Sequence, residues 1–404
     1  MTSKSVRALA LTMLLAGCGV LKTVKLMKQG EVVPETFTTT VPFVERMGLM
    51  VVKVRIHGAD YDFLLDSGAP NVITKELAAS LGLTSEVAQK VVDSQGKKND
   101  QEFVVLDSIG IGDVTFLNTG AVVADLLAVP ELACLQVSGF IGANLMRKVV
   151  WDIDNTARRI TLSDHFSPAS IPPDALKVPF LTEVTGTPKV DIRYNQRWVR
   201  SVTFDLGSSG GLTMDRDAYE SLINDGTLGP TSRGIGAGST GLYGRAENDS
   251  LIRTKVSHIA IGELGLESKV VEVVRRRAPV ALGRECLKNY RTIIDWSEKA
   301  VWLVLQDEYK GSGFRSFGVN PIYEKDRLLV GSIVNGSKAE KEGLKVGDQI
   351  TELNGMDRTN MAPDDWCALR DSLKSDKSDT LRITVLRNDE RVHVELVKEV
   401  FIAE

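Results

Sequence analysis

The chain has 404 residues, enough for two or three domains. Its 49 basic and 53 acidic residues nearly balance, and 25% of residues are charged, which excludes a largely disordered chain. No strongly basic face is indicated, so nucleic acid is not an expected partner. The one basic run, Arg275–Arg277, is interpreted as a solvated surface stretch.

The first eighteen residues differ in composition from the rest. Lys4 and Arg7 precede the apolar stretch Ala8–Leu15, and small residues then lead to Cys18. This pattern is typical of a secretory signal, and the apolar stretch is too short for a stable membrane-spanning helix. The segment Leu15–Cys18 resembles the bacterial lipoprotein box, which implies that Cys18 becomes the lipidated first residue. The alternative is a plain signal peptide with an incidental cysteine.

The lipoprotein resemblance implies an N-terminal organisation and a location. We expect residues 1–17 to be the signal peptide and residues 18–35 to form the lipid anchor and a polar tether. Gly19 stands where inner-membrane retention in that family requires Asp. The resemblance therefore implies a lipid-anchored protein of the bacterial cell envelope, at the outer membrane and facing the periplasm.

The remaining cysteines are Cys134, Cys286 and Cys367. An export compartment permits disulfides, but three is an odd number, so at least one thiol should stay free. Their roles are left open. No Cys/His group has the spacing of a zinc site, and we expect no metal and no cofactor.

Strands with turn signals dominate from about Val41 onward. The segment Leu49–Ile56 alternates apolar and basic residues, and a second apolar run then leads to Asp66. Alternation with a period of two predicts half-buried strands. Helical periodicity is scarce, and the clearest short helix is expected over residues 75–81, after Thr74 as its N-cap.

The sequence contains an internal repeat. Four landmarks occur twice, in the same order and at nearly the same spacing, which predicts two similar β lobes, residues 36–165 and 170–306. The paired landmarks are Phe63–Ala69 and Val202–Ser208, Ile109–Asp113 and Ile259–Glu263, Phe140–Gly142 and Ala281–Gly283, and Val150–Asp152 and Ile293–Asp295.

Each copy places an aspartate at the end of an apolar strand, at Asp66 and Asp205. A pseudo-two-fold axis between the lobes would bring the two carboxyl groups together, where they would share a proton. One carboxylate could then act as general base toward a water while the other donates to a peptide carbonyl. These two residues are the predicted catalytic pair. The loops around them contain Ser67, Gly68, Gly207 and Ser208.

Residues 36–306 resemble a bacterial aspartic peptidase with two retropepsin-like or pepsin-like lobes. Asp66–Ala69 matches the Asp-Ser/Thr-Gly-Ala motif of that family, and Ile141-Gly142 and Leu282-Gly283 match the motif that packs behind the active-site loop. The resemblance implies a mainly β fold of two pseudo-symmetric acid-protease lobes. It also implies an endopeptidase that cleaves extended peptide segments.

The second copy departs from the family pattern. Leu206 stands where the family has Ser or Thr, whose hydroxyl locks the two active-site loops together. Ser208 is the candidate replacement donor. The flap hairpins are expected at Val91–Phe103, which lacks a tyrosine, and at Gly234–Asn248, with Tyr243 near its tip.

Residues 311–400 resemble a PDZ domain of the form common in bacterial proteases, most specifically at Gly343–Gly355. A helix is expected over residues 363–373, followed by two strands. The resemblance implies that a peptide adds as an extra strand while a loop captures its terminal carboxylate. An alternative for Phe317 and Val319 is that both are simply core. The residues of the implied loop are Ser316, Phe317, Gly318 and Val319.

Two functions remain open at this point. The first is a lipid-anchored aspartic endopeptidase whose PDZ module binds peptide or protein C-termini. The second, favoured by Leu206 and the missing flap tyrosine, is a catalytically degenerate peptide-binding scaffold lipoprotein. A further alternative pairs Asp66 with Asp66 of another molecule. The expected partners are peptide or protein substrates, a C-terminal peptide ligand and the membrane.

Overall fold

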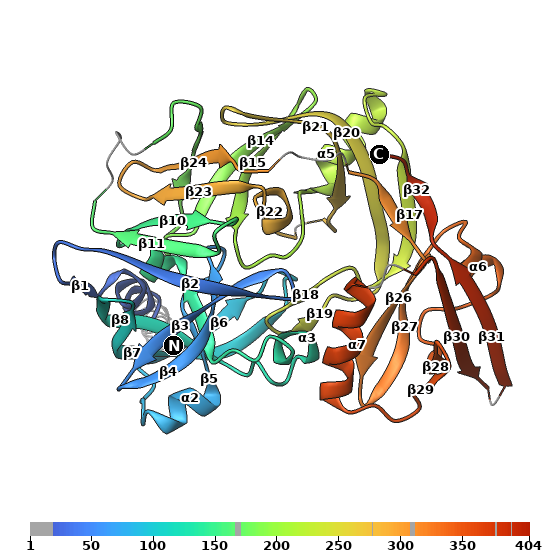
Figure 1. Cartoon of the computed structure of the whole chain (residues 1–404), viewed down its shortest axis with the longest axis horizontal. Helices are drawn as coiled ribbons and strands as arrows, with labels where there is room; N and C mark the ends of the chain where they lie inside the picture. The colour runs from blue at the N-terminus through green and yellow to red at the C-terminus, as the bar shows by residue number, and fades with distance from the viewer. Residues whose placement is uncertain (1–18, 166–170, 277, 308–311, 376–377, 389) are drawn as a thin grey trace, which may run out of the picture.

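The computed structural model describes residues 19–404 except 166–170, 277, 308–311, 376–377 and 389. The fold is mainly β, as predicted, with two β lobes and a C-terminal α+β domain at the right of Figure 1. The expected signal peptide and Cys18 lie outside the described residues. Within the described residues, no helix is both long and apolar enough to cross a membrane.

The first lobe is built around the strand that leads to Asp66. This strand, β4 (Ala59–Asp66), pairs antiparallel with β3 (Leu49–Ile56) and parallel with β9 (Gly139–Gly142), so Asp66 lies opposite Gly142. The other elements are β2 (Thr38–Arg46), β5 (Val72–Thr74), α2 (Lys75–Ser80), β6 (Val87–Val92), β7 (Lys98–Ile111), β8 (Val114–Ala124), α3 (Pro130–Ala133), α4 (Ala143–Met146), β10 (Val150–Asp154) and β11 (Arg159–Ser163).

The second lobe repeats this arrangement. Its strand β15 (Arg197–Asp205) pairs antiparallel with β14 (Pro188–Tyr194) and parallel with β22 (Ala281–Gly283), so Asp205 lies opposite Gly283. The other elements are β12 (Leu176–Pro179), β13 (Leu181–Thr182), β16 (Thr213–Met214), α5 (Arg216–Asn224), β17 (Thr231–Gly236), β18 (Thr240–Gly241), β19 (Gly244–Arg245), β20 (Asp249–Ile261), β21 (Leu264–Val273), the 3₁₀ helix η2 (Arg284–Cys286), β23 (Tyr290–Asp295) and β24 (Ala300–Leu305).

The helix expected after Thr74 is confirmed as α2. The Thr74 hydroxyl accepts a hydrogen bond from the amide of Leu77 at 3.2 Å, which satisfies one of the free N–H groups of the first turn. The second lobe has the same device at α5, where the Asp215 carboxylate accepts from the amide of Ala218. Both lobes therefore place a capped helix soon after their aspartate loop.

The two lobes join through an antiparallel ladder between β10 and β23. Trp151 lies opposite Ile294 in this ladder, and the two occupy equivalent positions of the sequence repeat. Two equivalent residues that face each other mark a local two-fold axis. Trp151 is fully buried and donates its indole N–H to the carbonyl of Met146, and one apolar core continues through both lobes.

The C-terminal domain has its own apolar core, which includes the stacked rings of Tyr323 and Trp366. The helix expected over residues 363–373 is present as α7 (Pro363–Ser375). The other elements are β25 (Phe314–Ser316), β26 (Val319–Glu324), β27 (Arg327–Val334), α6 (Lys338–Lys341), β28 (Gln349–Leu353), β29 (Met356–Asp357), β30 (Thr380–Arg387), β31 (Glu390–Val397) and β32 (Glu399–Ile402).

One sheet runs from the second lobe into the C-terminal domain. Strand β17 pairs antiparallel with β27, and the amides of Ala237 and Asn335 extend the ladder to the carbonyls of Gly331 and Arg233. A Cβ atom at Gly234 would lie only 2.5 Å from the carbonyl oxygen of Ile333. The close approach of the two strands therefore requires glycine at position 234.

Residues 18–35 were expected to form the lipid anchor and a polar tether, but the described part of this segment packs on the first lobe. Residues 19–28 form a helix whose Leu26 and Met27 are buried in an apolar cluster of the first lobe. Strand β1 (Glu31–Val33) then pairs with β8. The lysines suggested a solvated linker, but the apolar residues between them cover the lobe surface.

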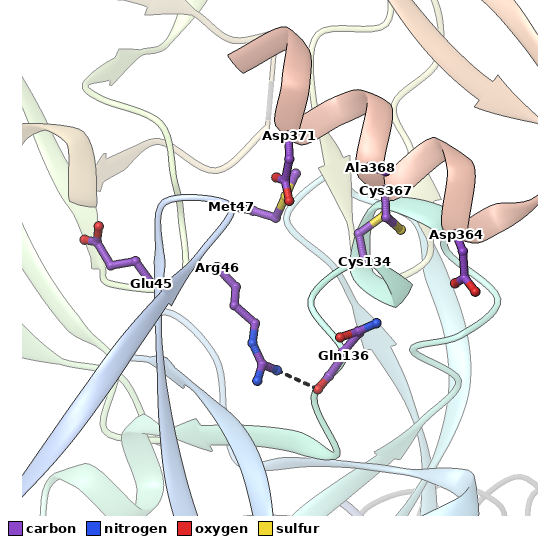
Figure 2. A pocket seen from close by; sticks show the side chains of 9 residues that line it. All are labelled: Glu45, Arg46, Met47, Cys134, Gln136, Asp364, Cys367, Ala368 and Asp371. Atoms are coloured by element: carbon purple, nitrogen blue, oxygen red, sulfur yellow. Dashed lines mark hydrogen bonds between the residues drawn. A yellow bond between two sulfur atoms is a disulfide. The ribbon is translucent and has the colours of Figure 1, made fainter. Parts of the chain in front are cut away.

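Two of the three cysteines whose roles were left open form a disulfide. Cys134 follows α3 of the first lobe and Cys367 lies on α7 of the C-terminal domain, with their sulfur atoms 2.02 Å apart (Figure 2). Cys286 is free. The C-terminal domain is therefore attached to the first lobe by a covalent bond and to the second lobe by a shared sheet.

We predict that Gly234→Val loosens the shared sheet without unfolding either domain. The valine Cβ would collide with a backbone carbonyl, so amide hydrogen exchange at Ala237 and Asn335 should become faster. Gly265→Ala is the control, because a Cβ atom there meets nothing within 4 Å. Equal protection in both variants would contradict the requirement for glycine.

Candidate active site

The two predicted catalytic aspartates lie side by side. A Cβ atom at Gly68 would be 2.6 Å from Cγ of Asp205, and one at Gly207 would be 2.2 Å from Cγ of Asp66. The glycine of each loop thus lies against the aspartate carboxyl group of the other lobe. Any side chain in place of either glycine would collide with that carboxyl group. The two carboxyl groups are close enough for the charge of Asp205 to raise the pKa of Asp66.

Backbone amides orient both carboxyl groups in the same way. Oδ1 of Asp66 accepts from the amides of Gly68 at 2.8 Å and Ala69 at 3.1 Å. Oδ1 of Asp205 accepts from the amide of Gly207 at 2.9 Å. One oxygen of each carboxyl group is held by its own loop.

Burial raises the pKa of Asp66 well above its ordinary value of 3.8, and the negative charge of Asp205 raises it further. Burial also raises the pKa of Asp205, although the nearby charge of Lys189 partly offsets this. Two carboxyl groups in contact cannot both ionise easily, so the pair holds one proton between them. A site with one acid and one base is the arrangement needed to activate a water and protonate a carbonyl.

The two aspartate loops are joined by a hydroxyl of the first loop only. Ser67 is fully buried, and its hydroxyl donates to the carbonyl of Phe204 at 2.7 Å and accepts from the amide of Leu206 at 3.0 Å. Leu206 is buried in the apolar core and offers no such group in return. The Ser208 hydroxyl lies beside Gly283 of its own lobe, so it does not replace the missing donor.

Two buried asparagines that the sequence analysis missed support the first loop. The backbone N–H of Asn71 donates to Oδ1 of Asn144 at 2.6 Å, and Oδ1 of Asn71 accepts from the backbone N–H of Gly142 at 2.7 Å. A Cβ atom at Gly142 would lie 2.0 Å from the carbonyl carbon of Pro70. An Asn right after the Asp-Ser-Gly-Ala-Pro segment and another after the Ile-Gly pair were the available signals in the sequence.

A second missed contact joins the lobes beside the dyad. Arg284 directly follows the Leu282-Gly283 pair of the second lobe, and its side chain is only 5% exposed. Its guanidinium pairs with Glu45 and donates to the carbonyl of Gly48, both near the turn between β2 and β3. A Cβ atom at Gly48 would lie 3.9 Å from Ser209, so this turn is next to the second aspartate loop.

Both segments expected to be flap hairpins are β hairpins, and their tips are bonded to each other. Asp93, in the turn between β6 and β7, accepts from the amide of Tyr243 at 3.0 Å. The Ser239 hydroxyl donates to the side-chain oxygen of Gln95 at 2.8 Å. Burial raises the pKa of Tyr243 to about 12, so its phenol is neutral.

In the loop expected to capture a terminal carboxylate, one backbone amide is already hydrogen-bonded within the loop. The Gly318 amide donates to the Ser316 hydroxyl at 3.0 Å, and a Cβ atom at Gly318 would lie 2.4 Å from Cβ of Ser337. Gly318 also has a φ of +77°, which favours glycine. Phe317 and Val319 pack partly against the domain core, which agrees with the alternative reading of these two residues.

We predict that Ser67→Ala destabilises the two lobes by about 2–4 kcal/mol, because it removes the hydroxyl that bonds the buried carbonyl of Phe204 and the buried N–H of Leu206. Ser208→Ala removes a hydroxyl of the same loop pair that makes no link between lobes, and it should cost well under about 1 kcal/mol. Urea unfolding of both variants measures the difference. Equal losses would show that Ser67 is not the lock.

Comparison with known protein families agrees with this geometry. Residues 52–145 match the family model described as aspartyl protease, which spans Asp66 and the β9 strand behind it. Residues 304–386 match the family model described as PDZ domain. No curated protein matches the chain. The family models thus recognise an aspartyl protease domain in the first lobe and a PDZ domain at the C-terminal end.

Proposed function

We propose that this protein is an aspartic endopeptidase with a peptide-binding PDZ module. The observation that carries the proposal is the contact between Asp66 and Asp205, which pairs two carboxyl groups of raised pKa from two lobes of the same chain. The aspartyl protease match over the first lobe supports the same reaction class. The intramolecular pair makes a partner aspartate from another molecule unnecessary.

In the proposed reaction, a water bound between the two carboxyl groups attacks the carbonyl carbon of an extended peptide. The ionised aspartate takes a proton from this water, and the protonated aspartate donates one to the carbonyl oxygen. The tetrahedral diol then collapses, the C–N bond breaks, and the leaving nitrogen takes a proton from the dyad. No covalent intermediate or cofactor takes part. The two hairpins are proposed to close over the peptide and exclude water.

The PDZ domain is proposed to bind the C-terminus of a peptide or protein. Support comes from the family match, which covers the loop at Gly318, the expected position of the carboxylate-binding amides. The proposed ligand would extend along the edge of β26 that faces away from β27.

We also propose that the protein is exported and lipid-anchored at Cys18, at the outer membrane facing the periplasm. The lipoprotein-like segment Leu15–Cys18 supports the anchor, and the disulfide between Cys134 and Cys367 is of a kind that persists in oxidising compartments. The helix at 19–28 packs on the first lobe, so an anchor at Cys18 would hold that lobe directly at the membrane.

A catalytically degenerate peptide-binding scaffold is the second candidate. The observation that favours it is the one-sided lock, since Leu206 leaves the second loop without the hydroxyl that Ser67 supplies from the first.

We predict that Asp66→Asn and Asp205→Asn each reduce peptide cleavage at least about a thousandfold, because each removes half of the acid and base pair. Asp107→Asn is the control, since its carboxylate is 75% exposed on the surface. Cleavage of a peptide library by the full chain measures the effect. Unchanged turnover in both dyad variants would favour the scaffold.

We predict a bell-shaped dependence of kcat/KM on pH, because only the singly protonated pair is active. The alkaline limb should lie well above pH 3.8, since burial raises both pKa values. Asp205 has the less strongly raised pKa and ionises first, and Lys189 lowers this pKa, so Lys189→Met should move the acidic limb to higher pH. Lys75→Met, at a side chain 60% exposed, should leave the profile unchanged. A shift to lower pH in Lys189→Met would contradict the assigned electrostatics.

A further inference from the structure

One edge of the PDZ sheet, where a peptide would add, is in contact with the second flap. Lys325 and Asp326 both have positive φ angles, as in a two-residue hairpin turn between β26 and β27. Such a turn makes Glu324 face Arg327 through hydrogen bonds, so the carbonyl of Tyr323 points away from β27. This outward carbonyl accepts a hydrogen bond from Arg245 at 3.4 Å.

Arg245 belongs to the small hairpin β18–β19 at the tip of the second flap, and it also holds the first lobe. Its guanidinium pairs with the carboxylate of Glu131 on α3, and the two side chains are only 15% and 11% exposed. The backbone carbonyl of Glu131 accepts in turn from Arg370 of α7 at 3.2 Å. Glu131 therefore connects the flap tip to the PDZ helix.

The disulfide lies at the same contact. Cys134 directly follows α3, and Cys367 lies one helical turn before Arg370 on α7. Both cysteines are half-buried, and they line a cavity of about 730 Å³ between α7 and the first lobe (Figure 2). A small thiol reagent can therefore reach the sulfur atoms without unfolding either domain.

We propose that the disulfide between Cys134 and Cys367 is a thiol-sensitive clasp that holds the PDZ domain and α3 against the tip of the second flap. With the clasp closed, the flap tip is held by Arg245 on one side and by its bonds to Asp93 and Gln95 on the other. Opening the clasp frees α3 to move away from α7. This movement weakens the ion pair of Arg245 with Glu131 and its hydrogen bond to the carbonyl of Tyr323. The flap tip then opens more readily.

The chemical step is a thiol–disulfide exchange with a dithiol as the reductant. A thiolate of the dithiol attacks one of the two sulfur atoms, forms a mixed disulfide and releases the other cysteine as a thiolate. The second thiol of the reagent then resolves the mixed disulfide. Both cysteines end as thiols, and the reagent, which has supplied two electrons and two protons, ends as a disulfide.

The effect on cleavage rests on the proposed peptidase function, whereas the effect on the flap does not. Substrate must enter past flap tips that are bonded to each other in the closed state. A clasp that restrains these tips slows entry, so reduction should increase kcat/KM.

The structural test is hydrogen exchange of the full chain before and after treatment with dithiothreitol. We expect amides of residues 240–245 to exchange about tenfold faster after reduction, since a buried ion pair and its hydrogen bond lose their support. The double variant Cys134→Ser/Cys367→Ser should exchange at this faster rate without reagent and should not respond to it. Protection that is the same in all four samples would overturn the clasp.

A variant that spares the sulfur atoms tests the link itself. Glu131→Gln removes the charge that holds Arg245 but leaves the disulfide intact, so it should also speed exchange at residues 240–245. Glu324→Gln is the matched control, because its side chain is 51% exposed and its only ion pair among the described residues is with Lys325. Slow exchange in Glu131→Gln would show that the disulfide does not act through this contact.

The functional test compares kcat/KM of the oxidised chain, the reduced chain and the double cysteine variant. We expect the reduced chain and the variant to cleave peptides several-fold faster than the oxidised chain. Faster exchange with no cleavage in any sample would refute the proposed peptidase and leave the clasp standing. Faster exchange with unchanged cleavage would refute the control of activity by the clasp.

Discussion

The arrangement of the candidate active site depends on the mutual contact of two glycines and two carboxyl groups. Gly68 lies against Asp205 and Gly207 lies against Asp66, so each lobe supplies the space that the aspartate of the other lobe needs. The carboxyl groups are consequently forced into the same small volume, where burial raises both pKa values and the charge of Asp205 raises that of Asp66 further. The raised pKa values and the sharing of one proton thus follow from one steric condition.

The backbone of the two lobes is nearly symmetric, whereas the contacts that hold them together are not. The first lobe provides the Ser67 lock, while the second provides the buried Arg284. A duplicated fold requires only the register of its strands to be repeated. The contacts at the axis need to be made once, so each can come from whichever lobe has the suitable side chain.

The sequence allowed the register to be predicted because the repeat is local: an apolar strand, an Asp and a Gly recur in order, and the pairs Asp66–Gly142 and Asp205–Gly283 follow from it. The helix at 19–28 was missed because its lysines are exposed while only Leu26 and Met27 are buried. The Cys134–Cys367 pair could not be predicted, since it depends on how two domains dock and not on any local pattern.

The ladder between β17 and β27 also changes what counts as a separable unit. The sequence places a boundary between the second lobe and the PDZ domain, but the sheet continues across it. A protein shortened before β25 would leave β17, with its exposed Ile235, as an open strand edge that can pair with another chain. The C-terminal domain therefore also covers a strand edge through which the two lobes could pair with another chain.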